Sequence, residues 1–377
     1  MKCIVCQHKE FEEIFNCKKL PVFAALQPIP LSEKNRFDAV LMRCRNCGFV
    51  QQKLSSKLKK FLANFYTKEA SFFTAPPTPT APDKRTKFNI SFLRHHLRGS
   101  VKSILEIGAY DGYFLNLLRK EFKAQSCVGI EILRLKNNFP GVKMIHDFYP
   151  SRKVAGDIFD VVILMNVLEH VFDPRDFMLK LHANLAEGGK ILIEVPNEEH
   201  HFKAGAASFQ HQHISYFTPV TAKRFLSEMG FKIDALYTKD LDRLLILCSK
   251  EKAISKKITS VDTSARGYAK RQLALVQKLK KVLESGKPSG LYGAATFTHN
   301  IVQLLDKPSS LYVFDGDSRK EGKYMSDVKN PVGSWKDIDS SGVKRVIITP
   351  LAFTPAIYKF LLSKKIKTPI VRLFTVR

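Results

Sequence analysis

Residues 101–122 read "VKSILEIGAYDGYFLNLLRKEF", and this stretch decides the fold of the middle of the chain. The apolar run at 101–107 predicts a buried strand, and Gly108 and Gly112 predict a tight turn directly after it. Apolar side chains then recur at helical spacing, at Phe114, Leu117 and Leu118. A strand, a glycine turn and a helix in this order form the first βα unit of a doubly wound α/β sheet.

Four further apolar runs continue this alternation of strands and helices. "CVGIEI" predicts a second strand that ends at Glu131, and "VKMIHDFYP" predicts a third that leads to Asp147. "FDVVILMNVLEHVFDP" predicts a fourth strand followed by a helix. "GGKILIEVPN" predicts a fifth strand, entered through the Gly188-Gly189 turn that ends the preceding helix.

The turn after the first strand favours a nucleoside ligand without phosphate. Its pattern ExGxxxG has Tyr110 where the dinucleotide fingerprint has its middle glycine, which lets the backbone approach a pyrophosphate closely. Glu131 is placed to accept hydrogen bonds from two ribose hydroxyls, while Glu106 and Asp111 lie where a charged amino-acid tail would bind. This combination predicts S-adenosylmethionine. A nicotinamide dehydrogenase is the competing interpretation.

The motifs "EIGAYDG" and "NVLEHV", in this order, resemble those of the class I methyltransferases. Taken alone, the pattern ExGxxxG is weak, and its combination with the second-strand acid, the third-strand Asp and "NVLEHV" is specific. The predicted cofactor-binding residues are Glu106, Gly108, Tyr110, Asp111, Gly112, Glu131, Asp147, Asn166 and His170.

Two CxxC pairs near the N-terminus predict a structural zinc site. Two thiolates separated by two residues face one ion, and two such pairs complete a tetrahedral shell with no open position. The predicted metal ligands are Cys3, Cys6, Cys44 and Cys47. Gly48 after the second pair permits the sharp backbone turn. Redox-active dithiols are the alternative interpretation, and Cys17 and His8 are possible substitute ligands.

Composition limits the class of protein. A length of 377 residues predicts two or three domains, and the longest apolar runs are too short to span a membrane. The first residues are charged and contain two cysteines, so we expect no signal peptide and a cytoplasmic protein. The formal net charge of +26 raises the possibility of an anionic partner, although the Lys and Arg residues are scattered along the chain.

The C-terminal third predicts a second, smaller α/β domain. A charged helix around residues 268–284 precedes "GLYGAATFTHNIVQLL", which reads as strand, glycine turn and helix. "SSLYVFDGD" and "VKRVIITPLAF" predict two more strands, followed by a final helix and strand. This domain has either its own organic or nucleotide ligand or only a docking role. The predicted parts are a zinc-binding module at 1–60, a linker or active-site flap at 61–95, a methyltransferase domain at 96–255 and a Rossmann-like domain at 256–377.

The order of these parts resembles the three-domain nucleotide-sugar C-methyltransferases of deoxysugar pathways. The resemblance covers nearly the whole chain and rests on "CIVC", "CRNCG", "EIGAYDG", "NVLEHV" and "LYGAATFTHN" with "FDGDSRKEGKY". It implies an α/β fold with a class I methyltransferase sheet, a small zinc module and a C-terminal Rossmann-like domain. It also implies that the substrate is a 4-keto nucleotide sugar, which loses the proton next to its carbonyl and is methylated on carbon.

The stretch "SFQHQHISYF" at 208–217 aligns with the family's catalytic segment. His213 matches the histidine that family chemistry uses as a base, and an imidazole with a pKa near neutrality suits proton abstraction. The resemblance implies His213, His211 and Gln212 as catalytic residues. It implies Gln210, Tyr216, Phe73, Tyr292 and Asn300 as substrate-binding residues.

Several positions depart from the family pattern. Gln212 replaces a glutamate, Gln210 replaces a tyrosine, and Phe72 and Phe73 stand where a flap tyrosine is common. Phe297 and Thr298 stand where the family tends to have a lysine-containing loop. These departures remove acid–base groups needed to form an enolate, so O- or N-methylation stays open beside C-methylation.

Three functions therefore follow from the sequence. The first is an S-adenosylmethionine-dependent methyltransferase of a sugar nucleotide or related glycan precursor. The second is an RNA methyltransferase with a zinc module, although no RNA-binding module is recognisable. The third is a catalytically impaired protein that still binds S-adenosylmethionine. We expect a small-molecule acceptor, no membrane span, no nucleic-acid partner, and a monomer or homodimer.

Overall fold

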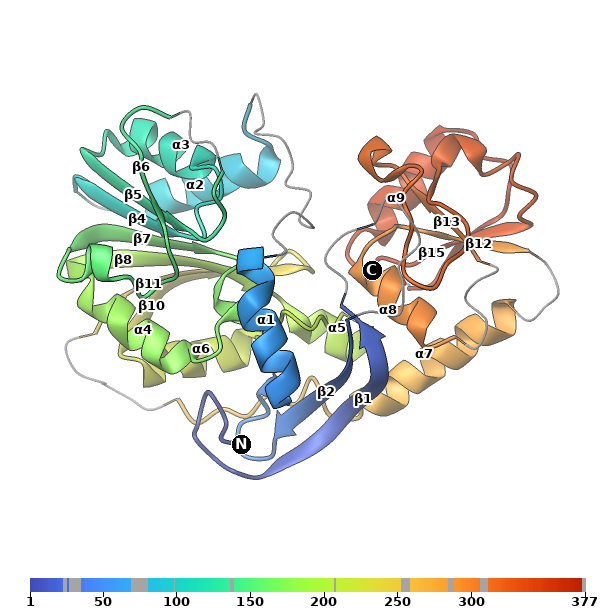
Figure 1. Cartoon of the computed structure of the whole chain (residues 1–377), viewed down its shortest axis with the longest axis horizontal. Coiled ribbons are helices and arrows are strands. Elements are labelled where there is room, and N and C mark those ends of the chain that lie inside the picture. Colours follow the sequence, from blue (N-terminus) through green and yellow to red (C-terminus); the bar gives the residue numbers. More distant parts are fainter. Residues whose placement is uncertain are drawn as a thin grey trace. The chain divides into compact units, whose positions relative to one another are not determined.

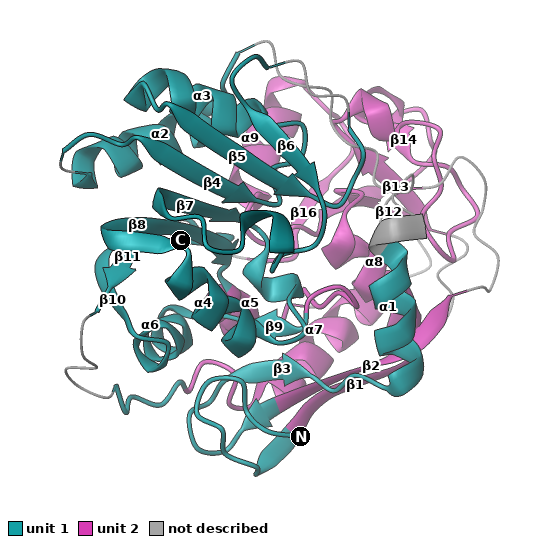
Figure 2. Cartoon of the chain, turned by 60° about the vertical axis from the view of Figure 1, so that its left-hand side comes forward, with its two compact units in different colours: residues 1–12, 43–197, 214–262 teal, residues 13–42, 198–213, 263–377 magenta. Residues whose placement is uncertain are grey.

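The computed structural model describes residues 1–22, 26, 35–68, 81–97, 99–135, 139–206, 208–251, 258–283, 288–305 and 311–374. Two compact units share these residues (Figure 2). Unit 1 comprises residues 1–12, 43–197 and 214–262, and unit 2 comprises residues 13–42, 198–213 and 263–377. Each unit is therefore assembled from separate segments of the chain. Within the described residues, no helix has the length and apolar character that crossing a bilayer requires.

The core of unit 1 is a seven-stranded sheet with the order β10-β11-β8-β7-β4-β5-β6. Strands β4 to β8 run parallel, and β10 and β11 add an antiparallel edge. The strands are β4 Ser103–Ile107, β5 Ser126–Glu131, β6 Lys143–His146, β7 Phe159–Met165, β8 Leu185–Pro196, β10 Phe231–Tyr237 and β11 Arg243–Lys250. From β4 the chain runs outward to β5 and β6 and then crosses back to β7 on the other side of β4, so the carboxyl end of β4 lies at the switch point where ligands of such sheets bind.

Helices cover both faces of this sheet (Figure 1). Helices α2 Lys84–His96 and α3 Tyr113–Phe122 lie on one face, and α4 Pro174–Ala183 and α6 Pro219–Glu228 lie on the other. Successive side chains of a strand point to opposite faces. Accordingly, Ile104 joins the core under α2 and α3, whereas Leu105 joins the core under α4 and α6.

Helix α3 confirms the strand–turn–helix prediction but buries a somewhat different face. Its fully buried apolar residues are Leu115 and Leu118, while Phe114 and Leu117 keep partial exposure. The apolar stripe of this helix is wide, so spacing alone did not select its centre.

The Gly188-Gly189 pair does not end the preceding helix, as the sequence suggested. Helix α4 ends at Ala183, and both glycines lie inside the long strand β8. There the pairing with β7 shifts from Phe159 opposite Leu185 to Val161 opposite Lys190, an irregularity that glycine tolerates because it adopts positive φ.

The N-terminal residues add a four-stranded sheet with the order β1-β2-β3-β9. Its strands are β1 Phe11–Pro21, β2 Arg36–Cys44, β3 Val50–Gln52 and β9 Ser215–Tyr216. Helix α1 Ser56–Lys68 follows β3, so α1 and α2 occupy much of the stretch 61–95 for which the sequence predicted a linker.

The cysteine pairs share an apolar core with the seven-stranded sheet of unit 1. Phe49, next to the second pair, lies with its ring centroid 5.3 Å from that of Phe217, and Phe217 lies 5.7 Å from Phe225 of α6. Cys3 and Cys47 are fully buried in the same cluster. The core around the four cysteines is therefore continuous with the core of unit 1.

Unit 2 contains a second doubly wound sheet, as predicted. Its five strands are parallel and have the order β14-β13-β12-β15-β16. They are β12 Ser289–Tyr292, β13 Tyr312–Asp315, β14 Gly333–Ser334, β15 Arg345–Ile348 and β16 Ile370–Arg372. The helices of unit 2 are α5 Glu198–Ala204, α7 Tyr268–Leu283, α8 Thr296–Gln303 and α9 Thr354–Ser363. The α/β fold with two doubly wound sheets is confirmed.

Candidate functional site

The glycine turn after β4 leaves no room for a larger residue. Gly108 has φ +75°, and a Cβ on it would lie 2.6 Å from Cγ2 of Val167. The N–H groups of Gly108 and Ala109 both donate to the carbonyl oxygen of Ile130, at 2.8 and 3.2 Å. The turn is thereby tied to the end of β5.

Glu131 at the end of β5 holds the same turn through its side chain. Its Oε2 accepts from the backbone N–H of Tyr110 at 2.8 Å. Its Oε1 accepts from the N–H groups of Ile132 and Leu133, at 2.7 and 3.0 Å. A carboxylate has about four lone-pair sites, so Glu131 keeps capacity for a ligand hydroxyl.

A cavity of about 330 Å³ opens at the carboxyl end of β4 in unit 1. Its lining residues are Asp83, Arg85, Thr86, Asn89, Glu106, Gly108, Ala109, Tyr110, Asp111, Tyr113, Phe114, Met165 and Glu194. Four predicted cofactor-binding residues are therefore brought together here, namely Glu106, Gly108, Tyr110 and Asp111.

Glu106 is a buried acid of this cavity. Its side chain is 3% exposed, and its Oε2 has no hydrogen-bond partner among the described residues. Burial, and then the charges of Glu131 and Asp111, hold the pKa of Glu106 well above its ordinary value. A ligand cation beside this carboxyl would offset that cost. The residues therefore fit the ammonium-bearing tail of S-adenosylmethionine.

The cavity is acidic although the chain as a whole is strongly basic. Four acids line it, Asp83, Glu106, Asp111 and Glu194, against the single cation Arg85. The formal charge of the whole chain is +26. Such a lining favours a cationic ligand and opposes the pyrophosphate of a dinucleotide.

One wall of the cavity comes from α2, which the sequence had placed in the linker. Glu194 of β8 is 2% exposed and accepts hydrogen bonds from Arg85 at 2.6 Å and from Arg243 at 2.7 Å. Asn89 of α2 donates to the same carboxylate at 3.1 Å. An acid inside the apolar run "ILIEVPN" was the available sequence signal for this wall.

The remaining predicted cofactor residues lie elsewhere along the same edge of the sheet. Gly112, with φ +81°, is the N-cap of α3. Asp147 follows β6 and accepts from the Ser151 hydroxyl at 2.7 Å. This bond lowers the pKa of Asp147. Asn166 follows β7 with φ +55°, and His170 lies in the 3-10 helix Leu168–His170.

Asn166 is linked to that 3-10 helix. Its Nδ2 donates to Oε1 of Glu169 at 3.3 Å. Glu169 is 1% exposed, and its carbonyl oxygen accepts from the N–H of Ile214 at 2.7 Å. The chain that follows His213 is thus fixed at the end of β7 before it pairs with β3.

The histidine-rich segment 208–213 is built into unit 2. His211 is 1% exposed, and its Nε2 lies 3.0 Å from the carbonyl oxygen of Leu20. Burial lowers the pKa of His211 to about 4, so its ring is neutral at neutral pH. Asn300 of α8 donates to the carbonyl oxygen of Phe209 at 2.5 Å. His211 and Asn300 therefore hold the backbone of the segment.

The other predicted acceptor residues are mostly buried. Gln212 and His213 are 4% and 8% exposed, and Gln210 is partly exposed. Tyr216 pairs with Val50 between β9 and β3, and Tyr292 ends β12. Phe73 lies outside the described residues, as does Phe72.

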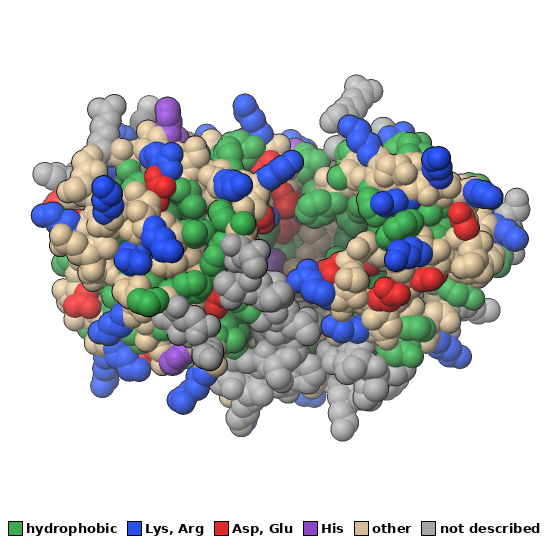
Figure 3. Space-filling view, turned by 90° about the horizontal axis from the view of Figure 1, so that it is seen from above, with side chains coloured by type: hydrophobic (Ala, Val, Ile, Leu, Met, Phe, Trp, Pro, Cys, Tyr) green, Lys and Arg blue, Asp and Glu red, His purple; other side chains and the backbone are tan. Residues whose placement is uncertain are grey.

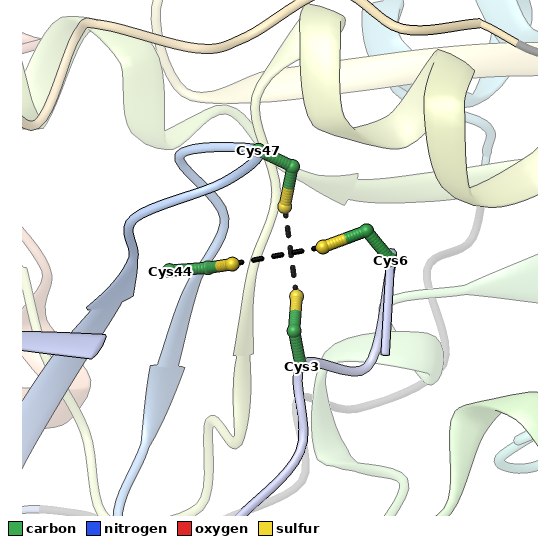
Figure 4. Close-up of side chains that lie close together, drawn as sticks. All are labelled: Cys3, Cys6, Cys44 and Cys47. Atoms are coloured by element: carbon green, nitrogen blue, oxygen red, sulfur yellow. Dashed lines mark hydrogen bonds between the residues drawn. The ribbon is translucent and has the colours of Figure 1, made fainter. Parts of the chain in front are cut away.

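The four predicted metal ligands converge in unit 1 (Figure 4). Their sulfur atoms all lie within 4.8 Å of one another, with Cys3 to Cys47 at 3.5 Å and Cys6 to Cys44 at 3.6 Å. A tetrahedral zinc ion with bonds of about 2.3 Å separates its sulfur ligands by roughly 3.8 Å, so the cluster fits zinc.

The two knuckles have the tight turns that this arrangement needs. The N–H of Gly48 donates to the carbonyl oxygen of Cys44 at 3.0 Å, and that of Gln7 donates to Cys3 at 2.9 Å. Gly48 has φ +80°, and a Cβ there would lie 2.0 Å from the carbonyl oxygen of Asp262. Cys17 and His8 are not part of the cluster.

Comparison with known proteins adds a domain family. The family model described as "Methyltransferase domain" matches residues 50–236, just under half of the chain. All residues that line the cavity lie within this range.

Two curated relatives are tRNA U34 carboxymethyltransferases. The protein from Pseudoalteromonas translucida is 30% identical over 148 residues, which cover 35% of this chain and 45% of the relative. The protein from Colwellia psychrerythraea is 32% identical over 120 residues, which cover 29% of this chain and 37% of the relative. The chain thus spans less than half the length of these relatives.

Similar solved structures include a methyltransferase from Burkholderia thailandensis that acts on 1,6-didemethyltoxoflavin. It is 12% identical with a TM-score of 0.40, and the match covers 57% of this chain and 96% of that one. An S-adenosylmethionine-dependent methyltransferase from Mesorhizobium loti is 15% identical with a TM-score of 0.35, covering 42% and 95%.

Proposed function

We propose that this chain methylates a sugar nucleotide or a related glycan precursor with S-adenosylmethionine as donor. Its methyltransferase domain lies within residues 50–236. The observation that carries the choice of donor is the buried Oε2 of Glu106, which has no hydrogen-bond partner among the described residues and lies in an acidic cavity at the switch point. The donor, when bound, supplies a methyl group on a positively charged sulfur.

Five of the predicted cofactor residues would contact the donor directly. Glu106 would accept from the ammonium of its amino-acid end, and Glu131 from its ribose hydroxyls. Asp147 would bind the base at the end of β6. Asn166 and His170, which follow β7, would border the methyl group. Most of the acceleration then comes from holding the acceptor atom in line with that group.

We propose that His213 is the base that removes the proton from the acceptor. Its Nε2 or Nδ1 would take the proton as the acceptor atom forms its bond to the methyl carbon. His211 is neutral and bonded to Leu20, so it serves to position the segment. Gln212 carries no acid–base group, which favours a hydroxyl or amine acceptor over an enolate. The order of zinc module, methyltransferase sheet and second Rossmann-like sheet supports the sugar-nucleotide class.

The test is transfer from methyl-labelled donor to a panel of nucleotide sugars. We expect label in a nucleotide sugar, with mass spectrometry and NMR locating it on C, O or N. His213→Ala should lower turnover by about 100- to 10,000-fold and leave donor affinity nearly unchanged. Unchanged turnover in this variant would remove His213 from the mechanism. Donor binding without transfer to any acceptor would support the catalytically impaired alternative.

An RNA acceptor is the second candidate. The curated relatives are named as tRNA enzymes, and the formal net charge is +26. Lys and Arg side chains are spread over the face in Figure 3 and are mixed there with other side chains. RNA binding that weakens steeply with ionic strength, together with label in RNA and none in nucleotide sugars, would favour this candidate.

We also propose that the four cysteines hold one structural zinc ion. Four thiolates leave no open coordination position, so the ion would fix the fold. Elemental analysis should find one zinc per chain. Reduced thiols of this kind also fit the cytoplasm, where zinc–thiolate sites persist.

A further inference from the structure

The C-terminal residues of unit 2 carry only positive charge. Residues 340–377 contain eight Lys and Arg residues and no Asp or Glu. The acids that precede them, Asp337 and Asp339, accept hydrogen bonds from the backbone N–H groups of Ser334 and Thr368, at 2.8 and 2.9 Å. Those two acids are therefore used by the fold, and the surface built from residues 340–374 attracts anions.

Helix α9 in this region presents apolar side chains to solvent. The helix packs against β15 and β16, and Leu361 joins the core of unit 2. Near the two ends of the helix, Phe353 is 56% exposed and Leu362 is 52% exposed. Lys359 is the only charged residue in the sequence between Phe353 and Ser363. Exposed apolar side chains gathered on one element are typical of a surface that contacts another molecule.

A group of lysines follows α9 directly. Lys364, Lys365 and Lys367 are all exposed. Exposed Phe and Leu side chains beside clustered lysines are typical of segments that lie at the surface of an anionic membrane. The α9 surface, as the name is used below, consists of Phe353, Lys359, Leu362, Lys364, Lys365 and Lys367.

The aromatic rings beside α9 favour lipid over RNA as its partner. Single-stranded RNA stacks its bases on free faces of aromatic rings. Trp335, Tyr358 and Phe360 pack against the core of unit 2. Nζ of Lys364 lies 5.0 Å from the ring centroid of Trp335 and 5.5 Å from that of Phe360, and Arg372 lies 4.9 Å from that of Tyr358. Because these rings already have a cation over them, they are poor platforms for bases.

We propose that the α9 surface binds the surface of an anionic lipid membrane. Phe353 and Leu362 enter the headgroup region, and the lysines contact lipid phosphates. The membrane is bound at its periphery, through charge complementarity and two apolar side chains. This partner goes beyond the proposed function, because it involves neither the donor nor the acceptor of methyl transfer.

The test is sedimentation of the full chain with lipid vesicles. The wild-type chain should bind vesicles of phosphatidylcholine and phosphatidylglycerol in equal parts, bind pure phosphatidylcholine far more weakly, and dissociate as ionic strength rises. Lys365→Gln combined with Lys367→Gln should weaken binding to the anionic vesicles about 25-fold, since each lysine near such a surface contributes about fivefold. Leu362→Gln should weaken it about fivefold through lost apolar burial.

Helix α7 of the same unit supplies matched controls. Lys278 and Lys281 are exposed there, and Leu273 is 59% exposed. Lys278→Gln combined with Lys281→Gln removes the same charge, and Leu273→Gln makes the same apolar-to-polar change. Neither control should alter vesicle binding appreciably. All these positions are exposed, so the Tm of every variant should stay near that of the wild type.

Three results would overturn the inference. Equal losses in the α7 and α9 variants would show that vesicle binding depends only on total charge. Failure of the wild-type chain to bind anionic vesicles would remove the partner. Binding of an oligouridine that is lost in the α9 variants, with no binding of vesicles, would assign the surface to RNA. The proposed methyl transfer is measured separately with labelled donor and stands or falls on that assay.

Discussion

The two units contain the same local motif, and its polar groups are satisfied differently in each. In each unit a parallel strand leads into a glycine turn and a helix, at Gly108 in unit 1 and at Gly293 in unit 2. An acid at the end of the neighbouring strand accepts from the backbone of that turn. Glu131 binds the N–H of Tyr110 at 2.8 Å, and Asp315 binds that of Ala294 at 2.7 Å.

The turns differ in how their polar groups are satisfied. Two residues before its glycine, unit 1 has the buried acid Glu106, whereas unit 2 has Leu291, which is fully buried. In unit 2 the Thr298 hydroxyl donates to the carbonyl oxygen of Gly293, and Lys320 donates to Asp315 at 2.9 Å. The strand and turn geometry is therefore shared. A ligand site arises where a buried group is left for the ligand to satisfy.

Crowding at the glycine itself is shared by the two turns. A Cβ on Gly293 would lie 2.4 Å from Cγ of Pro350, and a Cβ on Gly108 would lie 2.6 Å from Cγ2 of Val167. The cavity of about 330 Å³ in unit 1 is lined by Glu106, Gly108 and Tyr110. The difference between the turns therefore lies in their polar groups.

Metal removal should have the largest effect, and it should act on unit 1. Cys44→Ser should abolish zinc binding and destabilise unit 1 by several kcal/mol, since structural zinc contributes on the order of 10–16 kcal/mol in small domains. Hydrogen exchange should show lost protection in the knuckles and β3. The single tryptophan, Trp335, lies in unit 2, so its fluorescence follows that unit separately.

The control for the metal prediction is Cys17→Ser. Cys17 is buried but lies outside the four-sulfur cluster, so this change should keep the zinc. A Cys44→Ser chain with full stability and unchanged exchange would show that the cluster does not support the fold of unit 1.

Removing the charge of Glu106 should give the next largest effect. Glu106→Gln should weaken binding of S-adenosylmethionine about 100-fold, because it loses a hydrogen bond to a charged group in a buried place. Asp315→Asn in unit 2 is the matched variant and should leave this affinity unchanged. Titration calorimetry measures both. Equal losses in the two variants would mean that the donor does not bind at the turn of unit 1.

The pH dependence of donor binding should follow from the same carboxyl. The pKa of Glu106 in the free protein is raised, chiefly by burial, so part of the population is protonated below that pKa. A cationic tail binds the ionised form and expels the proton. Affinity should therefore rise with pH by up to about tenfold per unit, and become flat above the pKa of the free protein.

Calorimetry in two buffers of different ionisation enthalpy measures this proton release. The Glu106→Gln chain is the control, since it should bind weakly with no slope. A slope that persists in this variant would assign the titration to another group.

The sequence predicted the five parallel strands β4 to β8 of the first sheet and β12, β13, β15 and β16 of the second, because their apolar runs stand out beside glycine turns and acids. It did not predict β10, β11 or the short strand β14. Glu131 and Gly108 were found for this reason. The convergence of the two cysteine pairs was also predicted, because two CxxC pairs are the spacing typical of a four-thiolate metal site. In each of these cases, residues close together in sequence determine the structure.

The rest depends on contacts between distant segments. The α2 wall was missed because Asp83, the N-cap that accepts from Thr86, stands at the end of a Pro- and Thr-rich stretch. The family resemblance implied a catalytic role for His211, whereas its contact with the carbonyl oxygen of Leu20 depends on a segment 191 residues away. Local periodicity also gave no sign that residues 13–42 belong to unit 2.

The smallest predicted effect comes from removing the hydroxyl of Thr298, which bonds to the turn of unit 2. Thr298 is fully buried, and its hydroxyl also lies 2.5 Å from that of Thr349, which donates to the carbonyl oxygen of Tyr292 at 2.9 Å. Thr298→Val keeps the shape and removes these bonds, so it should cost about 1–3 kcal/mol of stability. Denaturation followed by Trp335 fluorescence measures this cost, and donor affinity should not change.

The direction of this change in stability is informative, because a substitution at the turn of unit 1 should change stability in the opposite direction. Glu106→Gln removes a buried acid that the charges of Glu131 and Asp111 disfavour, so unit 1 should become more stable as it loses its ligand. In unit 2 the polar bonds serve the fold, and their removal should lower stability alone. If Thr298→Val were neutral while Glu106→Gln destabilised the chain, the two turns would have the reverse roles, and Glu106 would be a structural residue.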